Sequence, residues 1–307
     1  MNELYTPPER GSRPNDAGPW GKAALGVALL ALLLAAAALY FALPRPERSE
    51  PEPEPAPSPG TILYRGQELP VLEGVAVNVY EAADFVQEAN GWLSYEKEGR
   101  KAAVGIDVSF YQGDVDWQQV AGAGVEFAVI RLGYRGYSKG VLQMDSKFEQ
   151  NIQGALDAGL DVGVYFFSQA VNTWEAEEEA EFVLQALEPY PVKGPVVFDW
   201  EFISGGEDVR TAGVEGAALT RCAGVFCDMI QAEGYQPMLY FNQDLGYLYY
   251  DLAALDQYPF WLAQYAAAPT FYYDFAMWQY SHTGKVPGIE GDVDLNLAFP
   301  AAEGETD

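Results

Sequence analysis

From Lys101 onward, apolar segments of two kinds alternate along the chain. Short runs rich in Val, Ile and Phe are apolar on both faces, which is typical of strands buried in a parallel sheet. Between them lie segments whose apolar residues recur every three or four positions, which predicts amphipathic helices. We expect strands at 102–109, 127–134, 161–167, 195–201, 236–241, 259–265, 275–281 and 292–299, and helices at 116–124, 145–159, 173–188 and 214–234. This alternation predicts an α/β fold, and about eight strands over about 200 residues predict a closed barrel.

The amino-terminal part of the chain has a different pattern. Residues 23–43 carry no charged side chain. A helix of about 21 residues is about 32 Å long, which matches a hydrocarbon core of about 30 Å. This stretch therefore predicts a transmembrane helix behind a short cytoplasmic tail at 1–22. A signal peptide is the alternative, because Ala36, Ala37 and Ala38 offer small residues for cleavage. In either case, we expect the rest of the chain outside the cytoplasm.

Three further segments complete the predicted organisation. Residues 44–60 carry seven prolines and four glutamates, which favours an extended linker without a core. Residues 61–102 alternate short apolar runs with turn signals, which predicts a small β-rich segment that packs on the barrel. The barrel is expected over 103–299, with a short tail at 300–307.

The charge and the scarcity of soft ligands limit the possible chemistry. The chain has 17 Lys and Arg against 45 Asp and Glu, so its formal net charge is −28. Such a charge disfavours binding to phosphate backbones, and we expect no nucleic-acid partner. One histidine and two cysteines are too few for a zinc site or a histidine relay. We expect no metal and no cofactor, and catalysis based on carboxylates.

Four carboxylates are expected at the carboxyl ends of the barrel strands, where the active sites of such barrels form. Asp107 ends the first strand, Asp199 and Glu201 end the fourth, and Asp294 lies in the last. Side chains alternate along a strand, so Asp199 and Glu201 point the same way. Crowded carboxylates in a dry pocket raise one another's pKa, which gives the protonated acid and the anion that glycosidic bond cleavage needs. The alternative is that some of these acids cap helices or pair with arginines.

Five motifs occur in order along the predicted barrel: GIDVSFYQGDVDW at 105–117, PVVFDWE at 195–201, FWLAQY at 260–265, MWQYS at 277–281 and GDVDLN at 291–296. Together they resemble glycoside hydrolase family 25, the Chalaropsis-type lysozymes. The resemblance implies a modified TIM-like (β/α) barrel with five βα units followed by three strands. It also implies hydrolysis of the β-1,4 bond between N-acetylmuramic acid and N-acetylglucosamine in peptidoglycan.

The same resemblance implies a role for each acid. Glu201 would be the general acid and base. Asp199 would stabilise the positive centre, either as a nucleophile or by supporting the substrate's own N-acetyl group, and the sequence leaves both open. Asp107 and Asp294 would orient the sugar and tune the pKa of Glu201.

Other side chains near the strand ends are candidates for binding sugar, because aromatic rings present flat apolar faces. Ordinary packing within the barrel is the alternative for each aromatic. The expected substrate-binding residues are Tyr165, Phe167, Trp261, Trp278, Gln279, Tyr280 and Arg131.

Together these features predict a monomeric, membrane-anchored, extracytoplasmic peptidoglycan hydrolase that acts in cell-wall remodelling. Its partners would be glycan strands and, through the amino-terminal helix, the membrane. Two alternatives remain: a catalytically weak glycan-binding protein that uses the same cleft, and a hydrolase of another N-acetylhexosamine polymer such as chitin.

Overall fold

The computed structural model describes residues 58–203 and 209–300. The predicted tail at 1–22, the predicted span at 23–43 and nearly all of the linker lie outside these residues. Among the residues described, no helix is long and apolar enough to cross a membrane.

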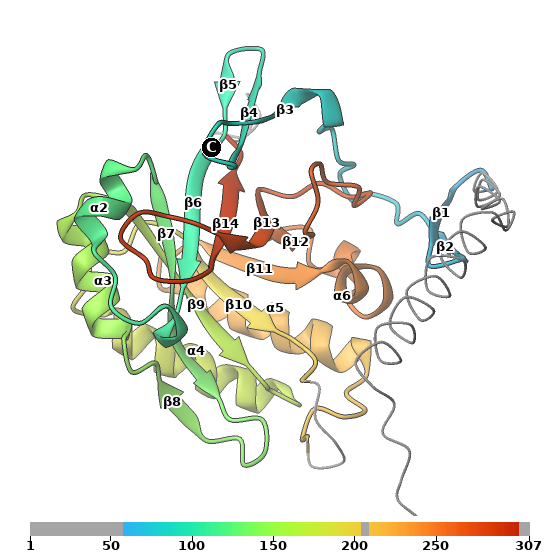
Figure 1. The fold of residues 1–307 in the computed structure, drawn as a ribbon. Helices are drawn as coiled ribbons and strands as arrows, with labels where there is room; N and C mark the ends of the chain where they lie inside the picture. The colour runs from blue at the N-terminus through green and yellow to red at the C-terminus, as the bar shows by residue number, and fades with distance from the viewer. Residues whose placement is uncertain (1–57, 204–208, 301–307) are drawn as a thin grey trace, which may run out of the picture. The chain divides into compact units, whose positions relative to one another are not determined.

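Eight strands form a closed barrel (Figure 1). Each neighbouring pair is parallel except for the pairs that β14 makes with β13 and β6. The first strand, β6, pairs with both β7 and β14, which closes the ring. A short strand, β8 (Leu142–Met144), extends β7 as an antiparallel hairpin. The barrel strands are β6 (Ala103–Val108), β7 (Phe127–Arg135), β9 (Asp161–Ser168), β10 (Val196–Trp200), β11 (Pro237–Asn242), β12 (Phe260–Ala263), β13 (Met277–Gly284) and β14 (Val293–Ala298).

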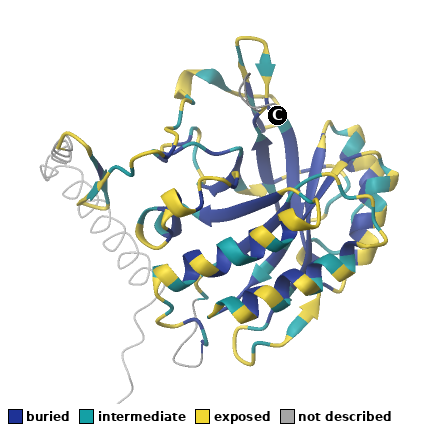
Figure 2. Cartoon of the chain, turned by 180° about the vertical axis from the view of Figure 1, so that it is seen from behind, coloured by how far each residue is buried: buried dark blue, intermediate teal, exposed yellow. Residues whose placement is uncertain are grey.

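Five helices follow the first five barrel strands, and the last three strands have no α-helix between them. This confirms the predicted barrel of five βα units plus three strands. The three longest of these helices turn a buried face to the strands and an exposed face to solvent (Figure 2). The helices are α2 (Trp117–Gly122), α3 (Phe148–Asp157), α4 (Thr173–Leu187), α5 (Gly216–Ala232) and α6 (Gln243–Leu248), with 3₁₀ turns η2 (Phe110–Gln112) and η3 (Leu252–Ala254).

The barrel strands separate two hydrophobic clusters, because successive side chains point to opposite faces. The larger cluster fills the space between strands and helices and includes Ile106, Phe198 and Trp200. The smaller cluster fills the barrel interior and includes Val129 and Val197. Along β10 the interior side chains are therefore Val197 and then Asp199, which places an acid directly above an apolar floor.

Residues 61–101 form short strands that lie against the barrel. The first two are a hairpin, β1 (Thr61–Tyr64) and β2 (Gln67–Pro70), and a turn η1 (Ala82–Asp84) precedes a small sheet of β3 (Phe85–Gln87), β4 (Leu93–Lys97) and β5 (Arg100–Lys101). Aromatic rings join this segment to the barrel: Tyr80 stacks on Phe299 at 4.0 Å between ring centroids, and Phe85 meets Trp278 edge-on at 5.1 Å. The segment thus extends the barrel's own hydrophobic core.

Candidate active site

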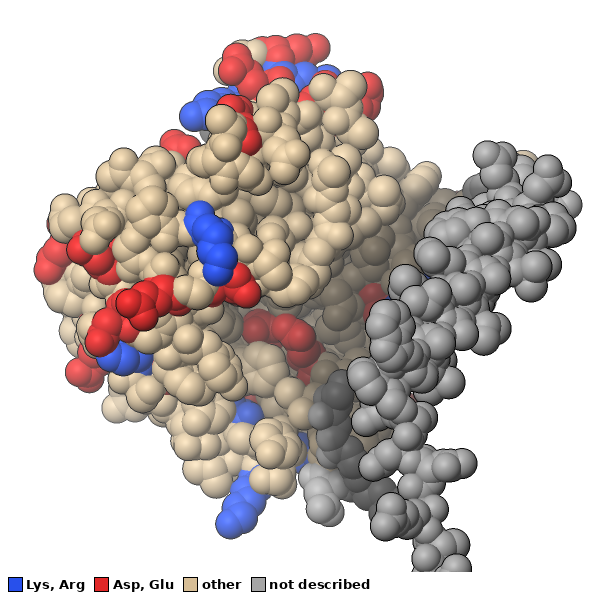
Figure 3. Space-filling model, viewed as in Figure 1, with Lys and Arg blue, Asp and Glu red and all other residues tan. Residues whose placement is uncertain are grey.

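The four predicted acids line one cavity of about 230 Å³. Asp107 comes from β6, Asp199 from β10 and Glu201 from the first residue after β10. Asp294 is the second residue of β14, and this strand runs antiparallel to its neighbours. Its amino end therefore lies beside the carboxyl ends of the parallel strands, and Asp294 is the register partner of Asp107. On the face seen in Figure 3, acidic side chains outnumber basic ones, and some lie within a hollow.

Asp107 is held by two side-chain amides. Gln279 Nε2 and Asn296 Nδ2 each donate to Asp107 Oδ2 at 2.8 Å. The oxygens of these amides are held in turn, because Tyr240 OH donates to Gln279 Oε1 at 2.9 Å and Trp261 Nε1 donates to Asn296 Oδ1 at 2.9 Å. With each oxygen occupied by a donor, both amides must turn their N–H groups toward Asp107.

Burial and mutual repulsion raise the pKa of every acid in the cavity. Burial, followed by the charge of Asp294, raises the pKa of Asp107 well above its ordinary value. Burial and the charges of Glu201 and Asp107 do the same for the pKa of Asp199. The pKa of Glu201 is raised by burial and by Asp107, and burial raises the pKa of Asp294 to about 6. The cavity therefore retains protons at a pH where free carboxyls have lost them.

Arg131 lines the cavity, and its guanidinium group contacts Asp145 and several aromatic rings. Arg131 Nε donates to Asp145 Oδ2 at 2.7 Å, and its guanidinium carbon lies over the rings of Phe110 and Tyr111 at 5.0 and 5.4 Å from their centroids. Its positive charge lowers the pKa of Asp199, against the effect of burial. Two buried atoms here, Arg131 Nη2 and Asp199 Oδ1, have no hydrogen-bond partner among the described residues.

The predicted sugar-binding residues divide between the two faces of the strands. Tyr165, Phe167, Trp261 and Gln279 line the cavity with the acids. Trp278 and Tyr280 do not, because they alternate with Gln279 along β13 and point outward. Trp278 Nε1 donates to the main-chain oxygen of Gln264 at 2.8 Å, and Tyr280 OH accepts from the Leu93 amide at 3.2 Å. The structure therefore places these two rings in the outer core, which is the packing alternative.

The structure also brings to the cavity residues that the sequence analysis did not select. Tyr240 and Tyr265 both donate to Gln279 Oε1, at 2.9 and 3.0 Å. Asn296 is two residues beyond Asp294, so the period of the strand could have placed both on one face. Tyr265 ends the motif FWLAQY, which could have marked it, whereas no comparable signal distinguishes Tyr240 from the many other tyrosines. Across the described ranges, no three or more acidic, histidine or cysteine side chains are arranged to hold a metal ion.

Comparisons with known proteins agree with this geometry. The model of the glycosyl hydrolases family 25 matches residues 106–289. The chain is similar to Lysozyme M1 of Streptomyces globisporus, with 28% identity over 205 residues that cover 62% of this chain and 66% of that protein, slightly less than two thirds of its length.

Solved structures show the same likeness. A family 25 glycosyl hydrolase from Bacillus anthracis is 26% identical, with a TM-score of 0.56 over 69% of this chain and 94% of that one. The bacterial lysozyme from Streptomyces coelicolor is 25% identical, with a TM-score of 0.53 over 66% of this chain and 93% of that one.

Proposed function

Because the chain belongs to the glycosyl hydrolases family 25, we propose that it is a muramidase that cuts the β-1,4 bond between N-acetylmuramic acid and N-acetylglucosamine in peptidoglycan. The prediction of a glycoside hydrolase is confirmed at the level of the family. The bond that is cut, the wall substrate and the roles of the residues belong to the proposal. One observation carries it: four carboxyls line a single partly buried cavity at the carboxyl end of the barrel.

Glu201 is the proposed general acid. It stands at the end of β10, two residues beyond Asp199, and is less buried than that residue. Burial and the charge of Asp107 raise its pKa, so that it keeps a proton for the leaving oxygen. After the bond breaks, the same carboxylate takes a proton from the attacking water.

Asp199 is the proposed partner of the positive centre. It lies deeper on the same face of β10, and its Oδ1 has no hydrogen-bond partner among the described residues. Burial and the charges of Glu201 and Asp107 raise its pKa, and Arg131 opposes this rise, so Arg131 is the group that favours the anion that an oxocarbenium-like centre needs. This anion acts either directly on the anomeric carbon or on the acetamido group of the substrate.

The location of the enzyme is also a proposal. The apolar stretch at 23–43 would anchor the chain, and the proline-rich stretch at 44–60 would hold the barrel outside the membrane. At about 3.1 Å per residue, 17 residues would reach about 50 Å from the bilayer. A monomeric, tethered enzyme of this kind suits wall remodelling close to the cell that makes it.

The test is product analysis with purified peptidoglycan and the full chain in detergent. Borohydride reduction and mass spectrometry identify the sugar at each new reducing end. We expect N-acetylmuramic acid there, and no release of oligosaccharides from chitin. N-acetylglucosamine at the new end, or cleavage of chitin alone, would contradict the proposal. Retained glycan binding without any cleavage would favour the alternative of a recognition protein.

A further inference from the structure

The main chain of Glu201 lies beyond the part of β10 that the sheet fixes. The last paired residue of β10 is Trp200, whose register partner is Ser168 at the end of β9. The residue after each strand then makes a different contact: Gln169 Nε2 donates to the main-chain oxygen of Glu201 at 2.8 Å. We propose that Gln169 is a positioning residue that sets how the Glu201 carboxyl enters the cavity, an inference that rests on the proposed function.

The side chain of Gln169 has one possible orientation. It is fully buried, and its Nε2 also donates to the main-chain oxygen of Ser168 at 2.8 Å. Its Oε1 accepts from Thr211 Oγ1 at 3.2 Å. A flipped amide would turn its oxygen toward two carbonyl oxygens and leave them without a donor, which is costly inside a protein. The other hydrogen bonds of the buried Gln169 side chain therefore hold its amide N–H toward the Glu201 main-chain oxygen.

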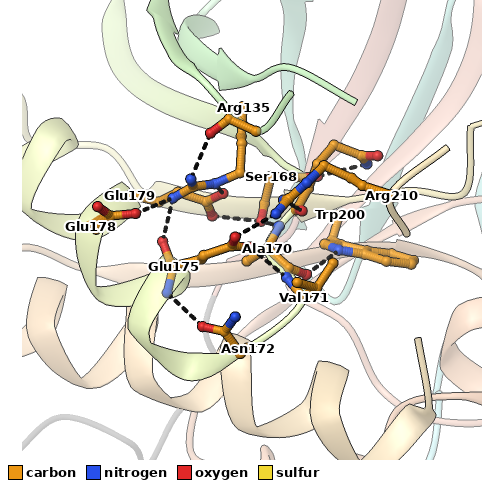
Figure 4. Close-up of polar contacts among 12 residues, drawn as sticks. Arg135, Ser168, Ala170, Val171, Asn172, Glu175, Glu178, Glu179, Trp200 and Arg210 are labelled. Carbon is orange, nitrogen blue, oxygen red and sulfur yellow. Dashed lines mark hydrogen bonds and ion pairs between the residues drawn. The ribbon is translucent and has the colours of Figure 1, made fainter. Parts of the chain in front are cut away.

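An ion pair holds the segment that carries Gln169 from one side. Arg210 donates to the main-chain oxygen of Gln169. It also pairs with Glu175 (Figure 4). The second oxygen of Glu175, Oε2, accepts from the Val171 amide at 2.9 Å. Arg210 and Glu175 thus hold the segment after β9 at two main-chain groups, the Gln169 oxygen and the Val171 amide.

A second ion pair holds the start of the same segment. Arg135 Nε donates to Glu179 Oε1 at 2.6 Å, and Ser168 Oγ donates to Glu179 Oε2 at 2.6 Å. Ser168 Oγ also accepts from the Ala170 amide at 3.1 Å. Glu179 has no exposed surface, so its charge depends on these partners. Figure 4 shows both ion pairs converging on the turn between β9 and α4.

This support matters because the Glu201 carboxylate has no hydrogen bond of its own within the described part of the chain. The direction of the Glu201 carboxylate therefore depends on the position of the Glu201 main chain, which Gln169 holds. A displacement of about 1 Å at a reacting group can lower turnover by about 100-fold. Gln169 would then affect the chemical step while it never touches the substrate.

The first test compares Gln169→Met with Thr220→Val in the full chain. Methionine keeps the length of glutamine but cannot hydrogen bond. Thr220 is a matched control, because its buried hydroxyl donates to the main-chain oxygen of Gly216 at 2.9 Å and accepts from the Asp251 amide at 3.0 Å. On soluble glycan strands, we expect Gln169→Met to lower kcat by about 10- to 100-fold with KM within about twofold. Thr220→Val should lower Tm and leave kcat unchanged. An unchanged kcat in Gln169→Met, or a raised KM alone, overturns the inference.

A second readout does not depend on cleavage. In protein labelled with ¹³C at the glutamate carboxyls, the Glu201 signal is the one that Glu201→Gln removes. We expect Gln169→Met to lower the pKa of Glu201 toward that of an ordinary carboxyl, because the displaced Glu201 carboxyl is less buried. The ionisable groups that line the cavity with Glu201 stay the same in both proteins: Asp107, Tyr111, Arg131, Tyr165, Asp199, Tyr240, Tyr265 and Asp294.

The two readouts separate the possible failures. An unchanged titration in Gln169→Met overturns the positioning role whatever the activity. If the unsubstituted chain cuts no glycan but the titration moves, the positioning role stands and the proposed function fails.

Discussion

The acids of the cavity differ in how they are held. Asp107 Oδ2 accepts from two fixed amides. Among the described residues, Asp199 Oδ1 is buried without a hydrogen-bond partner, and the Glu201 carboxylate accepts no hydrogen bond, whereas the Glu201 main-chain oxygen accepts one from Gln169. A group that orients the others needs fixed partners, whereas a group that gives and takes a proton must be free to do so. These contacts support Asp107 as the orienting acid and Glu201 as the proton donor.

At Asp294, burial has a consequence for stability. Its folded pKa of about 6 lies above the unfolded value of 3.8, so ionisation disfavours the folded state. This contribution to stability is complete below about pH 4 and is lost as the pH rises through about 6. We expect Asp294→Asn to raise the free energy of unfolding at pH 7.5 by on the order of 2 kcal/mol, and to have little effect at pH 4.

Urea unfolding at the two pH values measures this difference. The surface substitution Asp157→Asn is the control, because Asp157 lies at the exposed end of α3. Equal effects of Asp294→Asn at pH 4 and pH 7.5 would rule out a buried acid with a raised pKa.

The elements show which parts of the site the sequence could predict. The barrel strands followed from runs apolar on both faces. Asp107, Asp199 and Glu201 followed because each lies near the end of such a run, whereas Asp294 lies near the start of the last run. The sequence could not show on which face of the strand Trp278 and Tyr280 lie, because a barrel strand is covered on both faces and aromatic residues suit either one. Because side chains alternate along a strand, Trp278 and Tyr280 must lie on the face opposite Gln279. This inference requires knowing that Gln279 faces the cavity, which the structure shows. The sequence did not predict helix α6, although α2, which is equally short, was predicted.

The two faces of the strands predict different effects for two tryptophans. Trp261→Phe removes the donor that orients Asn296 toward Asp107. We expect it to lower kcat by about 10-fold or more. Trp278→Phe removes a hydrogen bond in the outer core, to Gln264, and should cost about 1 to 3 kcal/mol of stability with little effect on kcat.

Kinetics and urea unfolding of both variants measure these effects, and each tryptophan serves as the other's control. A loss of kcat in Trp278→Phe equal to that in Trp261→Phe would contradict the assignment of the two faces.

At the scale of the whole molecule, the formal charge of −28 shapes how the enzyme meets its substrate. Cell walls that carry anionic polymers repel such a protein over about 30 Å at 0.01 M salt and over about 8 Å at 0.15 M. The proposed membrane anchor offsets this repulsion, because it keeps the barrel near the wall whatever the charge.

We therefore predict that salt helps the enzyme on anionic walls. Raising NaCl from about 10 to about 150 mM should increase the initial rate of reducing-end release from walls that retain their anionic polymers. The same walls after chemical removal of these polymers are the control, and their rate should change little. A rate on anionic walls that falls with salt would show that the interaction is attractive, against this account.

If Glu201 is the general acid of a muramidase, its substitution must stop the formation of N-acetylmuramic acid reducing ends. The rate of N-acetylmuramic acid reducing ends formed from purified peptidoglycan is compared for the full chain, for Glu201→Gln and for Glu181→Gln, an exposed glutamate on α4. We expect a loss of at least about 100-fold in Glu201→Gln, the range for removal of a general acid, and an unchanged rate in Glu181→Gln. A Glu201→Gln protein that stays folded and keeps its rate would contradict this role of Glu201.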